Sequence, residues 1–86
     1  MSYALDVAPD AHTAWRGLDV DVQEAVLDEL DRIAATPFSL PRGPAVRDLV
    51  VSVGPVRHYV FIQVSVNHAR AVVSVYRIGH VSRGPG

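Results

Sequence analysis

The sequence has no cysteine, no lysine and no long apolar run. Without cysteine it can form neither disulfides nor thiolate metal sites. No stretch approaches the roughly 18 apolar residues of a membrane-spanning helix, so no membrane association is expected. The first ten residues, MSYALDVAPD, show neither the basic nor the apolar region of a secretion signal, which predicts a cytoplasmic protein. The spacing of His, Asp and Glu matches no metal motif, so we expect neither a metal nor a cofactor.

The length and composition are those of one small domain. The chain has 86 residues, of which 49% are hydrophobic. A chain of this size buries about 60% of the surface that its unfolded form exposes, so one apolar core is feasible. We predict a single domain over residues 1–86, with residues 79–86 forming a loose tail.

All eight basic residues are arginine, and they are separated from the acids along the chain. Residues 1–31 hold eight acids and one arginine, whereas residues 32–86 hold seven arginines and one acid. Such asymmetry predicts that the second half contacts a polyanion. The alternative is that the two halves neutralise each other within the fold.

Two helices are predicted in the acidic half. Pro9 suits the first turn of a short helix that ends near Leu18. Asp19 or Asp21 suits the cap of a second helix, which ends before Pro37 because the proline ring disfavours helical geometry in the preceding residue. In the second helix, apolar residues recur every three or four positions and form one stripe: Val22, Val26, Leu27, Leu30, Ile33 and Ala34.

One short strand is predicted before the helices, at residues 3–7, and three strands after a proline-rich loop at residues 37–44. The later strands are predicted over residues 49–53, 56–66 and 70–78, which are rich in β-branched residues. Turns at Gly54-Pro55 and Asn67-His68 join them into an antiparallel meander. The order β-α-α-β-β-β therefore predicts an α+β fold, with two N-terminal helices packed on one face of an antiparallel sheet.

Alternation along the long strand assigns its side chains to two faces of the sheet. His58 belongs to the set that meets the helices, where we expect a buried, hydrogen-bonded histidine. Arg57 and Tyr59 belong to the opposite, half-exposed set. If strand pairing brings Arg77 near Arg57, the two guanidinium groups would favour an anion between them.

The order of elements, together with three motifs, resembles the RelE/ParE family of bacterial toxins over residues 3–83. The motifs are a helix ending at Thr36-Pro37, a Gly54-x-x-Arg57 step from turn to strand, and a last strand with Val75, Arg77, Ile78 and His80. The resemblance implies the toxin of a type II toxin–antitoxin system, neutralised by a cognate antitoxin. RelE-like members cleave mRNA on the ribosome without a metal, which would make the chain an endoribonuclease.

The resemblance also implies site residues. Arg57 and Arg77 would neutralise phosphate charge, because a guanidinium binds phosphate oxygens with two parallel hydrogen bonds. His80 and Tyr59 would transfer protons. RNA contacts would come from Arg42, Arg47 and Arg83. Structural alternatives exist for these residues: arginine stems shield strand surfaces, strand tyrosines pack, and a histidine at a strand end forms hydrogen bonds.

The sequence departs from the family pattern at several positions. Val81 stands where the family has an arginine, and no tyrosine follows it. Pro55-Val56 replaces the usual Asp-Tyr, and the lysines that RNA-cleaving members place before the turn are absent. These departures favour two other functions: a ParE-like toxin that binds DNA gyrase, or a binding module that has lost catalysis. A third alternative is a homo-oligomeric scaffold, such as a homodimer, joined through sheet edges.

Overall fold

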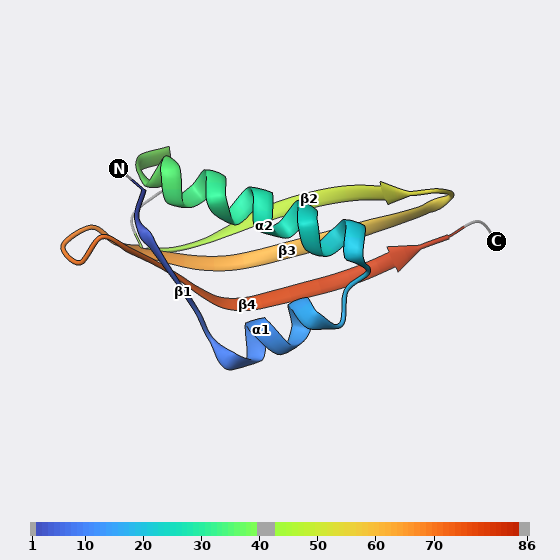
Figure 1. Cartoon of the computed structure of the whole chain (residues 1–86), viewed down its shortest axis with the longest axis horizontal. Helices are drawn as coiled ribbons and strands as arrows, with labels where there is room; N and C mark the ends of the chain where they lie inside the picture. Colours follow the sequence, from blue (N-terminus) through green and yellow to red (C-terminus); the bar gives the residue numbers. More distant parts are fainter. Residues whose placement is uncertain (1, 40–42, 85–86) are drawn as a thin grey trace.

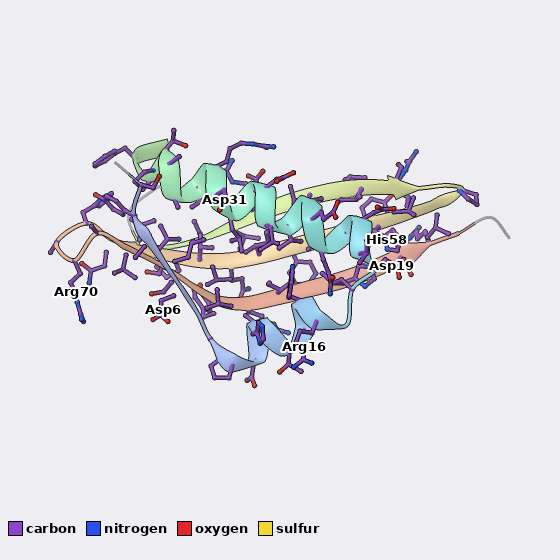
Figure 2. The ribbon with its side chains drawn as sticks, viewed as in Figure 1. Asp6, Arg16, Asp19, Asp31, His58 and Arg70 are labelled. Atoms are coloured by element: carbon purple, nitrogen blue, oxygen red, sulfur yellow. The ribbon has the colours of Figure 1, made fainter. Side chains whose placement is uncertain are left out.

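The computed structural model describes residues 2–39 and 43–84 (Figures 1 and 2). Its elements follow the order β1 (Ala4–Val7), α1 (Pro9–Arg16), α2 (Val20–Ala35), a 3-10 turn (Pro37–Ser39), β2 (Gly43–Val53), β3 (Val56–Asn67) and β4 (Val72–Arg83). The β-α-α-β-β-β order predicted from the sequence is therefore confirmed, and the fold is α+β.

The two helices begin and end at residues whose chemistry suits those positions. Pro9 occupies the first turn of α1, where its missing N–H would have no helical partner. Asp19 is the N-cap of α2, although its side chain makes no capping hydrogen bond. Trp15 and Gln23 tie the helices together: the Trp15 indole donates to the Gln23 carbonyl, and the Gln23 amide donates to the Trp15 carbonyl, each at 3.1 Å.

The sheet has the strand order β1-β4-β3-β2. The last three strands form the predicted antiparallel meander. β1 pairs with β4 in parallel, so the sheet is mixed rather than wholly antiparallel. Figure 1 shows both helices beside the long, twisted three-stranded ribbon, with β1 crossing at one end. β1 pairs with the start of β4, and in the sequence the two helices, β2 and β3 lie between these two strands.

Two strands are longer than predicted. β2 begins at Gly43 instead of residue 49, because an edge strand tolerates Pro44 on the side that has no neighbour. β4 continues to Arg83, so residues 79–83 are not the loose tail that the sequence predicted. They pair with residues 57–61 of β3 and extend the sheet by five residues.

A β-bulge in β4 changes which side chains share a face. Val75 pairs with Val64 and Arg77 pairs with Gln63, so Tyr76 is an extra residue with no partner on β3. Strict alternation would place Arg77 with Val75 on the helix side. The bulge instead turns Ile78 into the core, where it is buried, and leaves Arg77 exposed on the opposite face.

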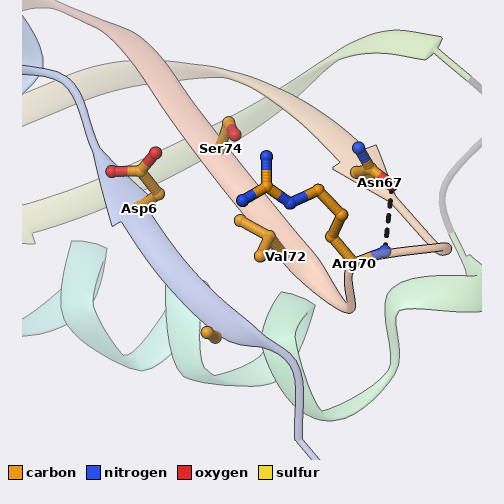
Figure 3. A pocket seen from close by; sticks show the side chains of 6 residues that line it. Asp6, Asn67, Arg70, Val72 and Ser74 are labelled. Atoms are coloured by element: carbon orange, nitrogen blue, oxygen red, sulfur yellow. Dashed lines mark hydrogen bonds between the residues drawn. The ribbon is translucent and has the colours of Figure 1, made fainter.

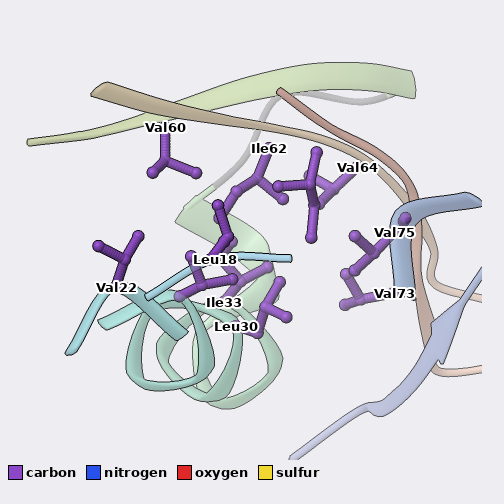
Figure 4. Close-up of a cluster of buried hydrophobic side chains, with 12 residues drawn as sticks. Leu18, Val22, Leu30, Ile33, Val60, Ile62, Val64, Val73 and Val75 are labelled. Atoms are coloured by element: carbon purple, nitrogen blue, oxygen red, sulfur yellow. The ribbon is translucent and has the colours of Figure 1, made fainter. Parts of the chain in front are cut away.

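The core lies between the helices and one face of the sheet (Figure 4). It contains most of the predicted helical stripe, but Leu27 is 45% exposed and does not belong to it. His58 is buried on this side, as predicted. The buried cluster comprises Ala11, Leu18, Val22, Val26, Leu30, Ile33, Val60, Ile62, Val64, Val73, Val75 and Ile78.

Candidate functional site

The sheet has a second face, on the side away from the helices, which we call the free face. Because strand side chains alternate, residues beside the buried Val60 and Ile62 point to it. No helix of the described chain covers it, and large apolar side chains are exposed there: Val46, Val50, Tyr59 and Val81. The acid Asp48 of β2 also faces this side, opposite Phe61. The free face thus combines exposed apolar surface with the arginines described next.

Two arginines lie directly opposite each other on the free face. Arg57 of β3 pairs with Arg83 of β4, and both are exposed. Opposite residues on neighbouring antiparallel strands have Cβ atoms about 5 Å apart, and like charges placed there destabilise a sheet. Within the described residues, neither guanidinium has an ion-pair partner. A bound anion would remove the repulsion, which makes this pair the centre of the candidate site.

Tyr59 and Val81 continue the same surface. They also lie directly opposite each other, two residues along each strand from the arginine pair. Tyr59, Val81 and Arg83 line a shallow depression of about 430 Å³. A tyrosine ring beside a guanidinium provides a surface on which a nucleic-acid base can stack while its phosphate is neutralised.

The predicted partner Arg77 shares the free face but is not beside Arg57. It pairs with Gln63, six residues along β3 from Arg57, which places it about 20 Å away. Arg70, which the sequence reasoning did not single out, is on the β3–β4 hairpin at the far end of this face. Arg70 lies two residues after the Asn67-His68 turn, and this position was the signal that could have identified it.

His80 lies on the helix side of the sheet, opposite to Arg57 and Tyr59. Its Nε2 is 2.8 Å from Nδ1 of the buried His58, and the two rings are stacked with centroids 5.1 Å apart. Nε2 of His58 lies 3.5 Å from a carboxylate oxygen of Asp19, and Figure 2 shows both residues at the end of the sheet where α2 begins. His80 therefore does not share a site with the arginine pair.

Arg47 also points to the helix side. Its Nε lies 3.4 Å from a carboxylate oxygen of Glu29, which is buried on α2 and whose other oxygen accepts a 2.9 Å hydrogen bond from Arg32. Arg47 thus joins β2 to α2 and is not part of the free face. Arg42, the other predicted RNA contact before the turn, lies outside the described residues.

The charge asymmetry of the sequence corresponds to two sides of the molecule. Among the described residues, the free face carries four arginines, Arg57, Arg70, Arg77 and Arg83, and two acids, Asp6 and Asp48. The side chains of these arginines form no hydrogen bond or ion pair with any described residue. The other acids lie on α1, on α2 or between them: Asp10, Asp19, Asp21, Glu24, Asp28, Glu29 and Asp31.

Within residues 2–39 and 43–84, His, Asp and Glu side chains form no group of three or more that could hold a metal ion. In the same residues, no helix has the length and apolar character needed to cross a membrane.

No family model and no curated protein matches the sequence, but solved structures match the fold. The isolated RelE toxin of E. coli is 23% identical, with a TM-score of 0.67 over 96% of this chain and 88% of the toxin. A chain of a RelBE toxin–antitoxin complex from Mycobacterium tuberculosis is 14% identical, with a TM-score of 0.64 over 94% of this chain and all (100%) of that one. A chain of the RelE–RelB complex from Pyrococcus horikoshii is 20% identical, with a TM-score of 0.62 over 91% and 93%. The chain therefore has the α+β fold of the RelE toxins.

Proposed function

We propose that this chain is the toxin of a toxin–antitoxin module and that it binds and cleaves mRNA on its free face. The observation that carries the proposal is the Arg57–Arg83 pair, two guanidinium groups that lie opposite each other on neighbouring strands and have no ion-pair partner among the described residues. A phosphate between them would accept hydrogen bonds from both and would cancel their repulsion. The RelE fold and the motifs in the sequence support the same assignment.

The cleavage would be an attack by a 2′-hydroxyl on the adjacent phosphate, as the resemblance to RelE toxins implies. The 2′-oxygen loses its proton and bonds to phosphorus, the bond from phosphorus to the 5′-oxygen breaks, and the 5′-oxygen leaves as a protonated hydroxyl. The arginine pair would stabilise the negative charge that develops on the phosphate oxygens. Tyr59 is the proton-transfer candidate on this face, because His80 lies on the helix side. Its phenolic hydroxyl is a hydrogen-bond donor and would give a proton to the leaving 5′-oxygen.

The partner in this proposal is a cognate antitoxin. Structures with the same fold have been solved as RelE–RelB complexes. An acidic antitoxin segment laid over the free face would neutralise its arginines and exclude RNA. In this proposal the complex and its mRNA target are cytoplasmic, and cleavage takes place on the ribosome.

A second function is binding without cleavage, as in a gyrase-directed toxin or a homologue that has lost catalysis. Two observations favour it. Val81 occupies a free-face position where the family has an arginine, and His80 is held on the opposite side by His58. Under this alternative, the free face would still bind an anionic partner, but no transcript would be cut.

The test is induced expression in a bacterial host, followed by growth measurement and primer extension on abundant transcripts. We expect growth arrest together with cuts inside coding regions. The Arg57→Ala variant should abolish the cuts, because half of the phosphate site is lost, while its thermal midpoint stays close to the parental value. Arg16→Ala, an exposed arginine on α1, is the matched control and should cleave like the parent.

The outcomes separate the two functions. Growth arrest with intact transcripts and induced DNA damage would indicate a gyrase-directed toxin. A protein without any effect on growth would be a binding module. If Arg57→Ala cuts transcripts as efficiently as the parent, the arginine pair is not the cleavage site.

A further inference from the structure

We infer that a pocket at the hairpin end of the free face is a guanine-binding subsite for the RNA strand that the arginine pair holds. The inference deepens the proposed function and rests on it. The hairpin pocket is lined by Ala4, Asp6, Asn67, Arg70, Val72 and Ser74 and has a volume of about 270 Å³.

The register places the hairpin pocket on the free face. Asp6 of β1 pairs with Ser74 of β4, whereas the neighbouring Val75 is buried on the helix side. Arg70 belongs to the hairpin that joins β3 to β4, and its backbone N–H donates to the Asn67 side chain at 3.1 Å. Figure 3 shows the Arg70 side chain extending from this hairpin over β4 toward Asp6.

The hairpin pocket is lined by one acidic and one basic side chain that do not form an ion pair with each other. Asp6 and Arg70 line the same cavity, yet no ion pair of 4.0 Å or less joins them. Within the described chain, neither side chain forms another hydrogen bond or ion pair. A ligand that fills the space between them therefore needs acceptors for the guanidinium and donors for the carboxylate.

Guanine meets both requirements at once. Its O6 and N7 atoms accept two hydrogen bonds from one arginine, which is the commonest specific contact between arginine and a base. Its ring and exocyclic N–H groups are donors that a carboxylate can accept. Adenine has a donor beside N7, at the position where guanine has the O6 acceptor, so it cannot accept both hydrogen bonds from Arg70. The carboxylate also argues against a simple phosphate site, because Asp6 would repel a phosphate.

The hairpin pocket lies in line with the arginine pair along β4. Arg83, Arg77 and Ser74 follow one another on the same face, and Arg83 and Ser74 are about 26 Å apart at the usual rise of a strand. Arg77 lies between them and would contact the intervening backbone. The distance suits a single strand of about four to six nucleotides, within the range of known single-strand sites.

The experiment measures dissociation constants of the full chain for labelled RNA hexamers by fluorescence anisotropy. The probes are hexa-adenylate and two hexamers with a single guanine, one at the 5′ end and one at the 3′ end. We expect one of the guanine-containing hexamers to bind about 5- to 100-fold more tightly than hexa-adenylate. Inosine in place of that guanine removes one donor and should lose much of the gain.

Two variants and two matched controls locate the effect. Asp6→Asn should remove the preference for guanine without weakening the binding of hexa-adenylate. Arg70→Ala should remove the preference and weaken all hexamers slightly, because it deletes a positive charge. Asp21→Asn and Arg16→Ala change the same charges on the helices and should leave the preference intact.

A second readout distinguishes failure of the subsite from failure of the proposed function. Guanosine monophosphate, but not adenosine monophosphate, should shift the backbone amide NMR signals of Val72 and Ser74. If no hexamer binds but these shifts occur, the RNA function fails and the guanine pocket stands. If hexamers bind with equal affinity whatever their sequence, or if Asp6→Asn keeps the guanine preference, the subsite is wrong although RNA binding remains.

Discussion

At the scale of single residues, Gly79 shows how tightly the free face is packed. It pairs with Phe61, and the Phe61 ring lies where a Cβ atom on residue 79 would be. A glycine in a strand often marks such a close approach, because only a residue without a side chain leaves room for a ring across the strands. Phe61 thereby fills the surface between the Tyr59–Val81 pair and Arg77.

We predict that Gly79→Ala destabilises the protein. The added methyl group would overlap the Phe61 ring and force it from its position, which should lower the free energy of unfolding by about 1–3 kcal/mol. Urea denaturation measures the change. In a Phe61→Ala background the same substitution should be nearly neutral.

Gly84→Ala provides the control, since a Cβ atom there would make only an ordinary contact, 3.7 Å from Val56. Equal destabilisation at residues 79 and 84 would indicate that loss of glycine, and not the ring contact, is responsible.

At the scale of elements, the contact between α2 and β2 depends on a buried carboxylate. Glu29 is 6% exposed and has Arg32 and Arg47 as partners. A buried charge is tolerated only where it is paired. The helix that carries most of the acids is thereby attached to the edge strand of the sheet.

We predict that Arg47→Met lowers the free energy of unfolding by about 1–2 kcal/mol, because Glu29 keeps its burial and loses one partner. RNA affinity should stay at the parental value, since Arg47 points away from the free face. Chemical denaturation and hexamer anisotropy measure the two effects. Arg32→Ala, at a side chain that is 73% exposed, should cost less than about 1 kcal/mol. A large fall in RNA affinity for Arg47→Met would restore Arg47 as an RNA contact.

At the scale of the whole molecule, charge is divided between two layers. The helical layer holds seven of the nine acids, while the free face holds four arginines with no ion-pair partner in the described residues. This arrangement would steer a polyanion toward the free face and repel it from the helical layer. The net charge of −1 conceals the arrangement completely.

We predict that RNA binding depends on salt in proportion to the arginines engaged. Each phosphate contact on a single strand contributes about 0.7 to the slope of log affinity against log salt concentration. Arg77→Ala should therefore reduce the slope by about 0.7, whereas Arg16→Ala should leave it unchanged. Hexamer titrations between 50 and about 200 mM salt measure this. Equal slopes for the parent and Arg77→Ala would exclude Arg77 from the RNA path.

Much of the fold could be predicted from the sequence, because its signals are local. Pro9 and Pro37 bound the helical region, and Gly54, with a φ of 58°, suits a two-residue hairpin loop that few other residues allow. Alternation in β3 correctly assigned His58 to the core and Arg57 to the opposite face. The first residues of β2 and the last residues of β4 were not predicted as strand. Pro44 and Gly79 weaken the local preference for strand structure there, and pairing with β3 maintains it.

The sequence by itself determined the order of the elements, the two faces of β3 and the separation of acids from arginines. These follow from periodicity and composition, which are properties of short segments. Only the tertiary structure decided which arginines lie opposite each other on neighbouring strands. The pairing register sets Arg83 against Arg57, the bulge at Tyr76 moves Arg77 to the free face, and His58 holds His80 on the other side. A register is fixed by contacts between distant segments, so no local pattern could have specified the Arg57–Arg83 pair.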